Sequence, residues 1–131
     1  MLTKEQLNIL SVFKKDIFTN LTFKQIKQQS RQKSNNIVQI ALKEFQKQDI
    51  VKTKETGDVT TYNLNLNNNL TLSYLNLINE SEINKSKIPK NILYNIQNRI
   101  FKHTEFFILI VFGSYAKNEA TKKSDLDIAV I

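Results

Sequence analysis

The sequence predicts a mixed α+β fold: three helices and a β-hairpin, then a connecting helix, and finally a helix, a strand, a short helix and a second strand. Three observations carry this prediction. The 131 residues include only two glycines and one proline, which favours helices. Two β-branched runs flank turn residues around Gly57. An apolar run of strand length ends at Gly113.

Apolar residues at helical spacing predict three helices before residue 50. Thr3 and Thr22 are expected to cap the first two, because each has a glutamine three residues later, as in a capping box. The first helix is expected to continue until the polar break at residues 19–20. Ser34 is expected to cap the third, which runs to about Lys47. Its apolar stripe comprises Val38, Ala41, Leu42 and Phe45.

Further along the chain, residues 50–54 and 59–64 predict the two strands of a hairpin, joined by a turn over 55–58. Leucines after the hairpin suggest a connecting helix that frays at residues 79–82, followed by a linker over 84–90. Pro89 suits the first turn of another helix, which is expected to end near His103. The unbroken apolar run 106–112 predicts a strand that is buried on both faces.

Three helices and a hairpin in this order resemble a winged helix-turn-helix domain. The resemblance is closest over residues 34–51, at the end of the third helix and the first strand of the hairpin. Asp49 stands where that family often has glycine, and aspartate tolerates the left-handed conformation. The resemblance implies double-stranded DNA as a partner. It also implies a homodimer through the winged-helix domain.

The candidate DNA-binding residues lie on the exposed side of the third helix, just before it, and on the hairpin. Asparagine and glutamine can pair with adenine edges, and lysine can contact phosphates. The predicted set is Arg31, Lys33, Asn35, Asn36, Gln39, Lys43, Lys52 and Lys54. The alternative is an ordinary polar helix face. Ile37 and Ile40 flank this side and are also compatible with a dimer surface.

The charge of the chain also points to a polyanion partner. There are 19 basic and 12 acidic residues, a net charge of +7, and residues 1–66 hold 11 of the basic and 6 of the acidic ones. Such a basic half most often binds nucleic acid. A solvated, lysine-rich surface is the alternative.

Composition excludes several classes of protein. With no cysteine and one histidine, the chain has no disulfide framework, no thiolate or multi-histidine metal site and no cysteine nucleophile. No apolar run approaches the roughly 20 residues of a membrane span. The first residues lack the apolar core of a signal peptide. We therefore expect a cytoplasmic protein with no membrane partner.

The segment 113–131 contains the residues that predict a binding site for an anion and a metal ion. Gly113 and Ser114 follow an apolar strand and can begin a short helix, which would aim backbone N–H groups and a hydroxyl at an anion. Asp125 and Asp127 open a second apolar strand two positions apart, so they are expected to share a face and to project toward that turn. Two carboxylates opposite phosphate donors predict Mg²⁺ bound together with a nucleoside triphosphate.

This segment resembles the minimal nucleotidyltransferases of the DNA polymerase beta superfamily, whose pattern is Gly-Ser, a short helix and an Asp-x-Asp strand. The resemblance implies that Asp125 and Asp127 are catalytic and hold the metal ions. It implies that Gly113 and Ser114 bind the triphosphate of the nucleotide substrate.

Three further positions are compared with that family. Ser124 matches the serine usually found just before the first aspartate, and it is expected to cap or brace the metal loop. Lys117-Asn118 departs from the common Arg-Gly, which keeps the charge and changes the loop. Lys117 and Ser124 complete the predicted nucleotide-binding set. Tyr115 is interpreted as a packing residue, with stacking on a base as the alternative.

The family also supplies a third carboxylate from a later strand, and no acidic residue follows Asp127 here. We therefore expect weak or no turnover, from either a fragment of a longer protein or a degenerate form. The predicted organisation is a winged-helix domain over 1–68, a connecting helix and linker over 69–88, and a partial nucleotidyltransferase-like domain over 89–131.

Three functions stay open at this point. The first is a DNA-binding protein fused to a truncated nucleotidyltransferase domain, which would transfer a nucleotidyl group from a nucleoside triphosphate with Mg²⁺. The second is a non-catalytic transcriptional regulator whose nucleotidyltransferase remnant senses nucleotide or mediates dimerisation. The third is protein–protein docking through the apolar winged-helix face.

Overall fold

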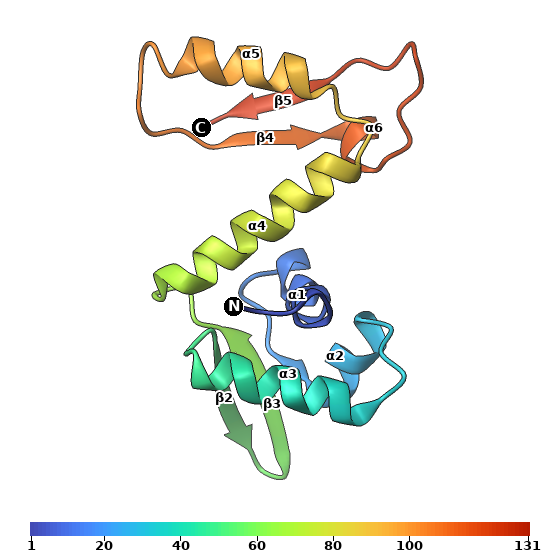
Figure 1. Ribbon diagram of the computed structural model, residues 1–131, viewed down its shortest axis with the longest axis vertical. Coiled ribbons are helices and arrows are strands. Elements are labelled where there is room, and N and C mark those ends of the chain that lie inside the picture. The colour runs from blue at the N-terminus through green and yellow to red at the C-terminus, as the bar shows by residue number, and fades with distance from the viewer. The chain divides into compact units, whose positions relative to one another are not determined.

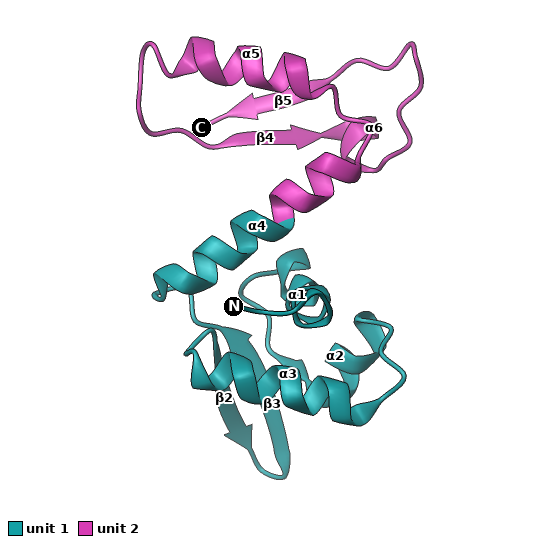
Figure 2. Ribbon diagram, viewed as in Figure 1, with its two compact units in different colours: residues 1–78 teal, residues 79–131 magenta.

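The computed structural model describes residues 1–131, which form two compact units over residues 1–78 and 79–131 (Figure 1, Figure 2). The first unit contains α1 (Lys4–Leu10), the 3₁₀ helix η1 (Ser11–Lys15), β1 (Leu21–Thr22), α2 (Phe23–Gln29), α3 (Asn35–Lys47), β2 (Val51–Thr56) and β3 (Val59–Leu64). Helix α4 (Asn69–Lys85) begins in the first unit and ends in the second. The second unit also contains α5 (Lys90–Ile100), β4 (Leu109–Phe112), α6 (Gly113–Ala116) and β5 (Asp127–Val130). The predicted α+β class is confirmed.

Capping boxes start the first two α-helices, as predicted. The Thr3 hydroxyl accepts a hydrogen bond from the Gln6 backbone N–H at 3.2 Å, and the Gln6 side chain accepts one from the Thr3 N–H at 2.8 Å. Thr22 and Gln25 repeat the arrangement at the start of α2. Ser34 occupies the cap position of α3, but its side chain makes no capping hydrogen bond, so that part of the prediction is wrong. The first helix is also shorter than expected, because α1 tightens into η1 after Leu10.

The wing is an antiparallel hairpin of β2 and β3, which pair from Val51 opposite Leu64 to Thr56 opposite Val59. The turn is tighter than predicted, because only Gly57, at φ +58°, and Asp58 lie between the strands. A two-residue strand, β1, joins the sheet in the order β1-β3-β2. It was not predicted, since a two-residue strand has no periodic pattern.

The core of the first unit is formed by the buried face of α3 together with apolar residues of α1, η1, α2 and β2. The predicted stripe is confirmed: Val38 and Phe45 are fully buried, as is Phe13 of η1. Helix α4 adds Tyr74 and other apolar residues to the same cluster. The Tyr74 hydroxyl also accepts a hydrogen bond from the Leu2 N–H at 3.2 Å. The first half of α4 is therefore part of the first unit's core.

The turn between α3 and β2 is held by two asparagines that follow the hairpin. Asp49 has the left-handed φ of +53° that the sequence permitted. The Asn65 amide donates to the Asp49 carboxylate at 2.7 Å and to its backbone carbonyl at 3.0 Å. The Asn68 amide donates to the Gln48 and Asp49 carbonyls, each at 2.9 Å. These bonds satisfy carbonyls that the end of a helix leaves without partners.

The second unit departs from the predictions at several boundaries. Helix α4 continues without a break to Lys85, so the expected fraying at residues 79–82 is wrong. Helix α5 has Pro89 at its N-cap and ends at Ile100, before His103. Strand β4 pairs antiparallel with β5, with Phe112 opposite Asp127. The three-part division of the chain stays a prediction. None of the helices combines the length and the hydrophobicity that a membrane span requires.

Strand β4 is shorter and more exposed than predicted. The run 106–112 becomes a strand only over Leu109–Phe112. Phe106 is 89% exposed, and Ile108, Ile110 and Phe112 are exposed as well, while the residues between them are half-buried. The prediction of burial on both faces is therefore wrong, because one face of this two-stranded sheet is uncovered.

Candidate nucleic-acid and nucleotide sites

Helix α3 has one buried and one exposed face, and the spacing of its apolar residues predicted which residues lie on each. Asn36, Gln39 and Lys43 are all exposed, on the side opposite Val38 and Phe45. Ile40, which is 54% exposed, lies on the same face, three or four positions from Asn36 and Lys43. This face therefore offers amide and ammonium groups around one apolar side chain. That arrangement can form hydrogen bonds with base edges and make an apolar contact with a thymine methyl group.

The segment before α3 adds basic side chains. Arg31 and Lys33 are exposed, and Arg31 has a left-handed backbone at φ +56°. Asn35 is exposed as predicted, but its side-chain oxygen accepts a hydrogen bond from the Lys27 ammonium at 2.6 Å. Asn35 is thus already engaged within the protein.

A basic pocket beside this segment was not predicted from the sequence. It has a volume of about 490 Å³, and its lining residues are Lys24, Lys27, Gln28, Arg31 and Gln32. The three cations recur at helical spacing along α2 and its end, a pattern that could have identified them. The basic surface thus extends from α3 onto α2.

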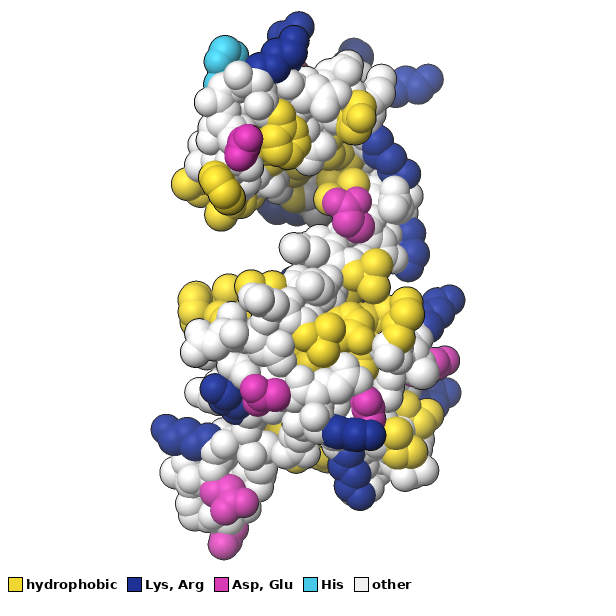
Figure 3. Space-filling view, turned by 60° about the vertical axis from the view of Figure 1, so that its left-hand side comes forward, with side chains coloured by type: hydrophobic (Ala, Val, Ile, Leu, Met, Phe, Trp, Pro, Cys, Tyr) yellow, Lys and Arg dark blue, Asp and Glu magenta, His cyan; other side chains and the backbone are white.

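The wing presents its predicted lysines to solvent. Lys52 and Lys54 alternate along β2, so they share one face of the strand, and both are exposed. Figure 3 shows lysine and arginine side chains spread over the surface and interspersed with acidic ones.

The second candidate site centres on Gly113 and Asp127. Gly113 has a left-handed φ of +69°, and a Cβ built at this position would overlap Oδ2 of Asp127 and lie 3.1 Å from its Cγ. The carboxylate therefore rests directly against the backbone of the turn that ends β4. This matches the expected approach of Asp127 to the Gly-Ser turn. Any side chain at position 113 would displace the carboxylate.

Asp125 does not lie in the strand as predicted, because β5 begins only at Asp127. Asp125 is exposed and belongs to the loop before β5, so the two-residue spacing of a strand does not place both carboxylates on one face. The two aspartates therefore differ in their secondary structure, and the carboxylate of Asp127 lies against the turn. The two carboxylates supply the hard oxygen ligands that Mg²⁺ prefers. No group of three or more acidic or histidine side chains suited to a metal occurs in residues 1–131.

The loop between α6 and β5 is held by Ser124. Its hydroxyl accepts a hydrogen bond from the Thr121 N–H at 2.8 Å, and its own N–H donates to the Thr121 carbonyl at 3.1 Å. Ser124 thus braces the loop that leads to Asp125. Asn118 has φ +60°, which explains how an asparagine fits where the resembled family has glycine.

The remaining predicted nucleotide-binding residues lie on α6 or directly after it. Ser114 is half-buried and Lys117 is exposed just after the helix. Helix α6 has only four residues. The dipole contribution expected from this helix is therefore small, because few peptide units align.

Comparison with known proteins connects the second site with a family. Residues 94–131 match the family described as "Polymerase beta, Nucleotidyltransferase". The matched segment includes Gly113, Ser114, Asp125 and Asp127, and it covers less than half of the chain. No curated protein sequence is significantly similar to the chain.

Solved structures with a similar fold include three bacterial proteins. MepR, a transcription regulator of the Staphylococcus aureus multidrug efflux pump MepA, has a TM-score of 0.50 and 14% identity, over 79% of this chain and 81% of its own. Lactococcus lactis ZitR, a zinc-responsive MarR family member, has a TM-score of 0.49 and 17% identity, over 78% and 76%. Bordetella bronchiseptica BpsR, whose DNA binding is regulated by 6-hydroxynicotinic acid, has a TM-score of 0.47 and 9% identity, over 79% and 76%. At 14% identity the likeness to MepR concerns the fold alone, and it agrees with the predicted winged helix.

Proposed function

We propose that the chain is a DNA-binding winged-helix protein that reads double-stranded DNA with α3 and contacts the phosphate backbone with the wing. The observation that carries this proposal is the exposed polar face of α3, opposite a fully buried apolar face. Asn36, Gln39 and Lys43 supply the groups for base edges and phosphates. Arg31 and Lys33 before the helix, and the wing lysines, extend the basic surface. Asn35 joins this set only if its bond to Lys27 opens on binding.

Binding of a fluorescent duplex, measured by anisotropy at several salt concentrations, tests this proposal. We expect affinity to fall steeply with salt, because phosphate contacts release counterions. Lys43→Ala should weaken binding and reduce the salt slope by about one. Lys102→Ala, which removes the same charge from an exposed position in the second unit, is the matched control. Affinity that is independent of salt would contradict DNA binding through phosphates.

The second unit is proposed to bind a nucleoside triphosphate with Mg²⁺. The observation that favours this is the contact of the Asp127 carboxylate with the Gly113 turn, inside the segment that matches a nucleotidyltransferase family. Asp125 and Asp127 would hold the metal, with Gly113, Ser114, Lys117 and Ser124 beside the phosphates. Bound there, Mg²⁺ would neutralise phosphate charge during attack of a hydroxyl on the α-phosphate, with pyrophosphate as the leaving group.

A nucleotidyl-transfer assay and a nucleotide-binding measurement together separate two outcomes of this proposal. Transfer of labelled nucleotide to an acceptor would identify an enzyme, whereas Mg²⁺-dependent nucleotide binding without transfer would identify a nucleotide-sensing regulator. We expect residues 1–131 to bind without measurable transfer, because no group of three or more carboxylates is gathered within them. Asp127→Asn should abolish the Mg²⁺-dependent binding, measured by calorimetry. Equal binding by this variant and the unmodified chain would contradict the metal site.

A homodimer is the proposed assembly. Leu70 and Leu77, seven positions apart and therefore on one side of α4, are exposed within residues 1–78, although other residues of the same helix are buried in the core. Leu72 is exposed on a different side of the helix. Figure 3 shows hydrophobic side chains exposed on the surface. An apolar surface of this kind is typical of protein interfaces. Light scattering of the purified chain, with and without duplex DNA, tests the assembly and distinguishes a dimer from docking to a different protein.

A further inference from the structure

The ammonium group of Lys27 in α2 is fixed by a side chain of the next helix. Its Nζ donates a hydrogen bond to Oδ1 of Asn35, the first residue of α3, at 2.6 Å. The lysine is half-buried, whereas the asparagine is exposed. The bond therefore connects the two helices across the segment that joins them. It also holds the end of a long side chain in one place, which costs rotamer entropy before any ligand binds.

This bond fixes the charge of Lys27 without neutralising it. An amide oxygen accepts a hydrogen bond but carries no net charge, in contrast to the carboxylate of an aspartate or a glutamate. Lys24 and Arg31 line the same basic pocket as Lys27, and none of the residues that line it is acidic. Three like charges that no carboxylate compensates attract an anion to this side of the molecule.

Asn35 lies at the edge of the α3 face that is proposed to read DNA. Gln39 follows four positions later, so the two residues are neighbours on the helix surface, and both are exposed. The ammonium group that Asn35 holds has three N–H donors, of which two remain for a phosphate oxygen. Bidentate pairing with adenine needs both the oxygen and the nitrogen of an asparagine amide. The bond from Lys27 engages that oxygen and therefore disfavours base reading by Asn35.

We propose that Asn35 is a positioning residue, which keeps its bond to Lys27 when DNA binds and holds that ammonium group for a backbone phosphate. The inference rests on the proposed DNA binding and deepens it, because it assigns a phosphate contact to α2 and removes Asn35 from the residues that read bases. Asn36, the next residue, has the same side chain and is also exposed. Since the Lys27 ammonium group bonds to Asn35 instead, Asn36 can pair with a base edge.

The salt dependence of duplex binding separates a positioning role from base reading, because Asn35→Ala changes no charge. We expect this variant to bind about threefold more weakly and its salt slope to fall by up to about one, since fewer counterions are released. Fluorescent duplexes of alternating A·T pairs and of alternating G·C pairs, measured by anisotropy, should be affected equally. Asn36→Ala is the matched comparison, and it should keep the salt slope while lowering the preference for the A·T duplex.

A double-mutant cycle decides whether Asn35 acts through Lys27. We expect Asn35→Ala to cause no further loss of affinity in a chain that already carries Lys27→Ala, because two residues that make one contact are not additive. Independent, additive losses would overturn the inference, and so would an unchanged salt slope in Asn35→Ala. Circular dichroism of each variant verifies that it folds.

A measurement without DNA keeps this inference distinct from the proposed function. In NMR spectra of the free chain, Lys27→Ala should shift the side-chain amide signals of Asn35 far more than those of Asn36, and equal or absent shifts would overturn the inference. Duplex binding that does not depend on salt would contradict the proposed function, and the phosphate contact with it. Salt-dependent binding with the same slope in Asn35→Ala and the unmodified chain would contradict the positioning role alone.

Discussion

The carboxylate of Asp127 occupies the space that a side chain at position 113 would need, so Gly113 and Asp127 fit together only while residue 113 has no Cβ. The two residues face each other because Phe112, the neighbour of Gly113, pairs with Asp127 across the β4–β5 sheet. Strand register and the left-handed turn at Gly113 thus position one carboxylate at the end of β4.

Gly113→Ala should therefore disturb the nucleotide site. The new Cβ meets the Asp127 carboxylate, and the left-handed backbone adds about 1 kcal/mol of strain for a residue with a side chain. We expect calorimetry to give about a tenfold lower affinity for Mg²⁺-ATP. Gly57→Ala is the control, because Gly57 also has a left-handed φ, at +58°, and beyond its two chain neighbours no residue lies within 4 Å of the place that its Cβ would take. Unchanged affinity in Gly113→Ala would contradict the role assigned to this contact.

Asn65→Ala should destabilise the first unit. Asn65 is buried, and its amide holds both the carboxylate and the carbonyl of Asp49. A hydrogen bond to a charged group contributes about 1.5–3 kcal/mol. We expect a loss of that size in the free energy of unfolding, measured by urea denaturation. Asn67→Ala, at an exposed position nearby, should change it little, and equal losses in the two variants would argue against a specific role for Asn65.

Ile40 should contribute to DNA recognition through thymine. It is exposed on the same face of α3 as Asn36 and Lys43, and an apolar side chain there can contact the thymine methyl group. Replacing thymine with deoxyuracil throughout a bound duplex removes that methyl group. We expect this change to weaken binding of the unmodified chain and to have no effect on Ile40→Ala, measured by anisotropy. Equal sensitivity of both proteins would instead favour the dimer-surface interpretation of Ile40.

Ile110→Lys should be tolerated by the fold. Ile110 lies on the exposed face of β4, where a charged side chain reaches solvent. We expect circular dichroism to be unchanged and binding of a hydrophobic dye to fall, because an apolar surface is removed. Val111→Lys, on the half-buried face, is the comparison and should unfold the second unit more easily. Unfolding by Ile110→Lys alone would indicate that this face is covered.

Local patterns predicted the first unit well. The capping boxes at Thr3 and Thr22, the stripe on α3 and the left-handed Asp49 all depend on residues close in sequence, so they can be recognised without the fold. Burial of β4 could not be predicted in this way. An apolar run indicates a strand, but the covering of its faces depends on elements elsewhere in the chain.

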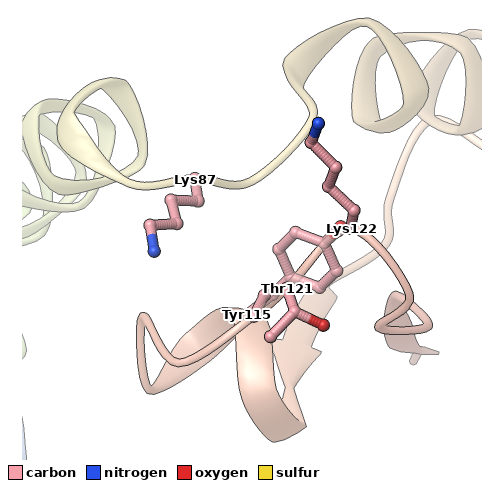
Figure 4. Close-up of a pocket in the computed structure, with 5 residues that line it drawn as sticks. Lys87, Tyr115, Thr121 and Lys122 are labelled. Carbon is pink, nitrogen blue, oxygen red and sulfur yellow. The ribbon is translucent and has the colours of Figure 1, made fainter.

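In the candidate sites too, features set by local sequence were predictable and features set by distant segments were not. The exposure of Asn36, Gln39 and Lys43 followed from helical periodicity. The position of Asp125 did not follow from its spacing to Asp127, because β5 starts two residues later than expected. A shallow hollow lined by Lys87, Tyr115 and Lys122 joins segments that are distant in sequence, so no local pattern indicates it (Figure 4).

The side-chain amides of Asn65 and Asn68, which follow the wing, form hydrogen bonds with Gln48 and Asp49, which precede it. Both ends of the hairpin are thereby fastened to the same turn, and Asn65 also donates its backbone N–H to the Ile50 carbonyl at 2.8 Å. Opening of the wing must then break these asparagine hydrogen bonds together with the strand pairing. The amide protons of β2 and β3 should consequently exchange with deuterated solvent as one cooperative group.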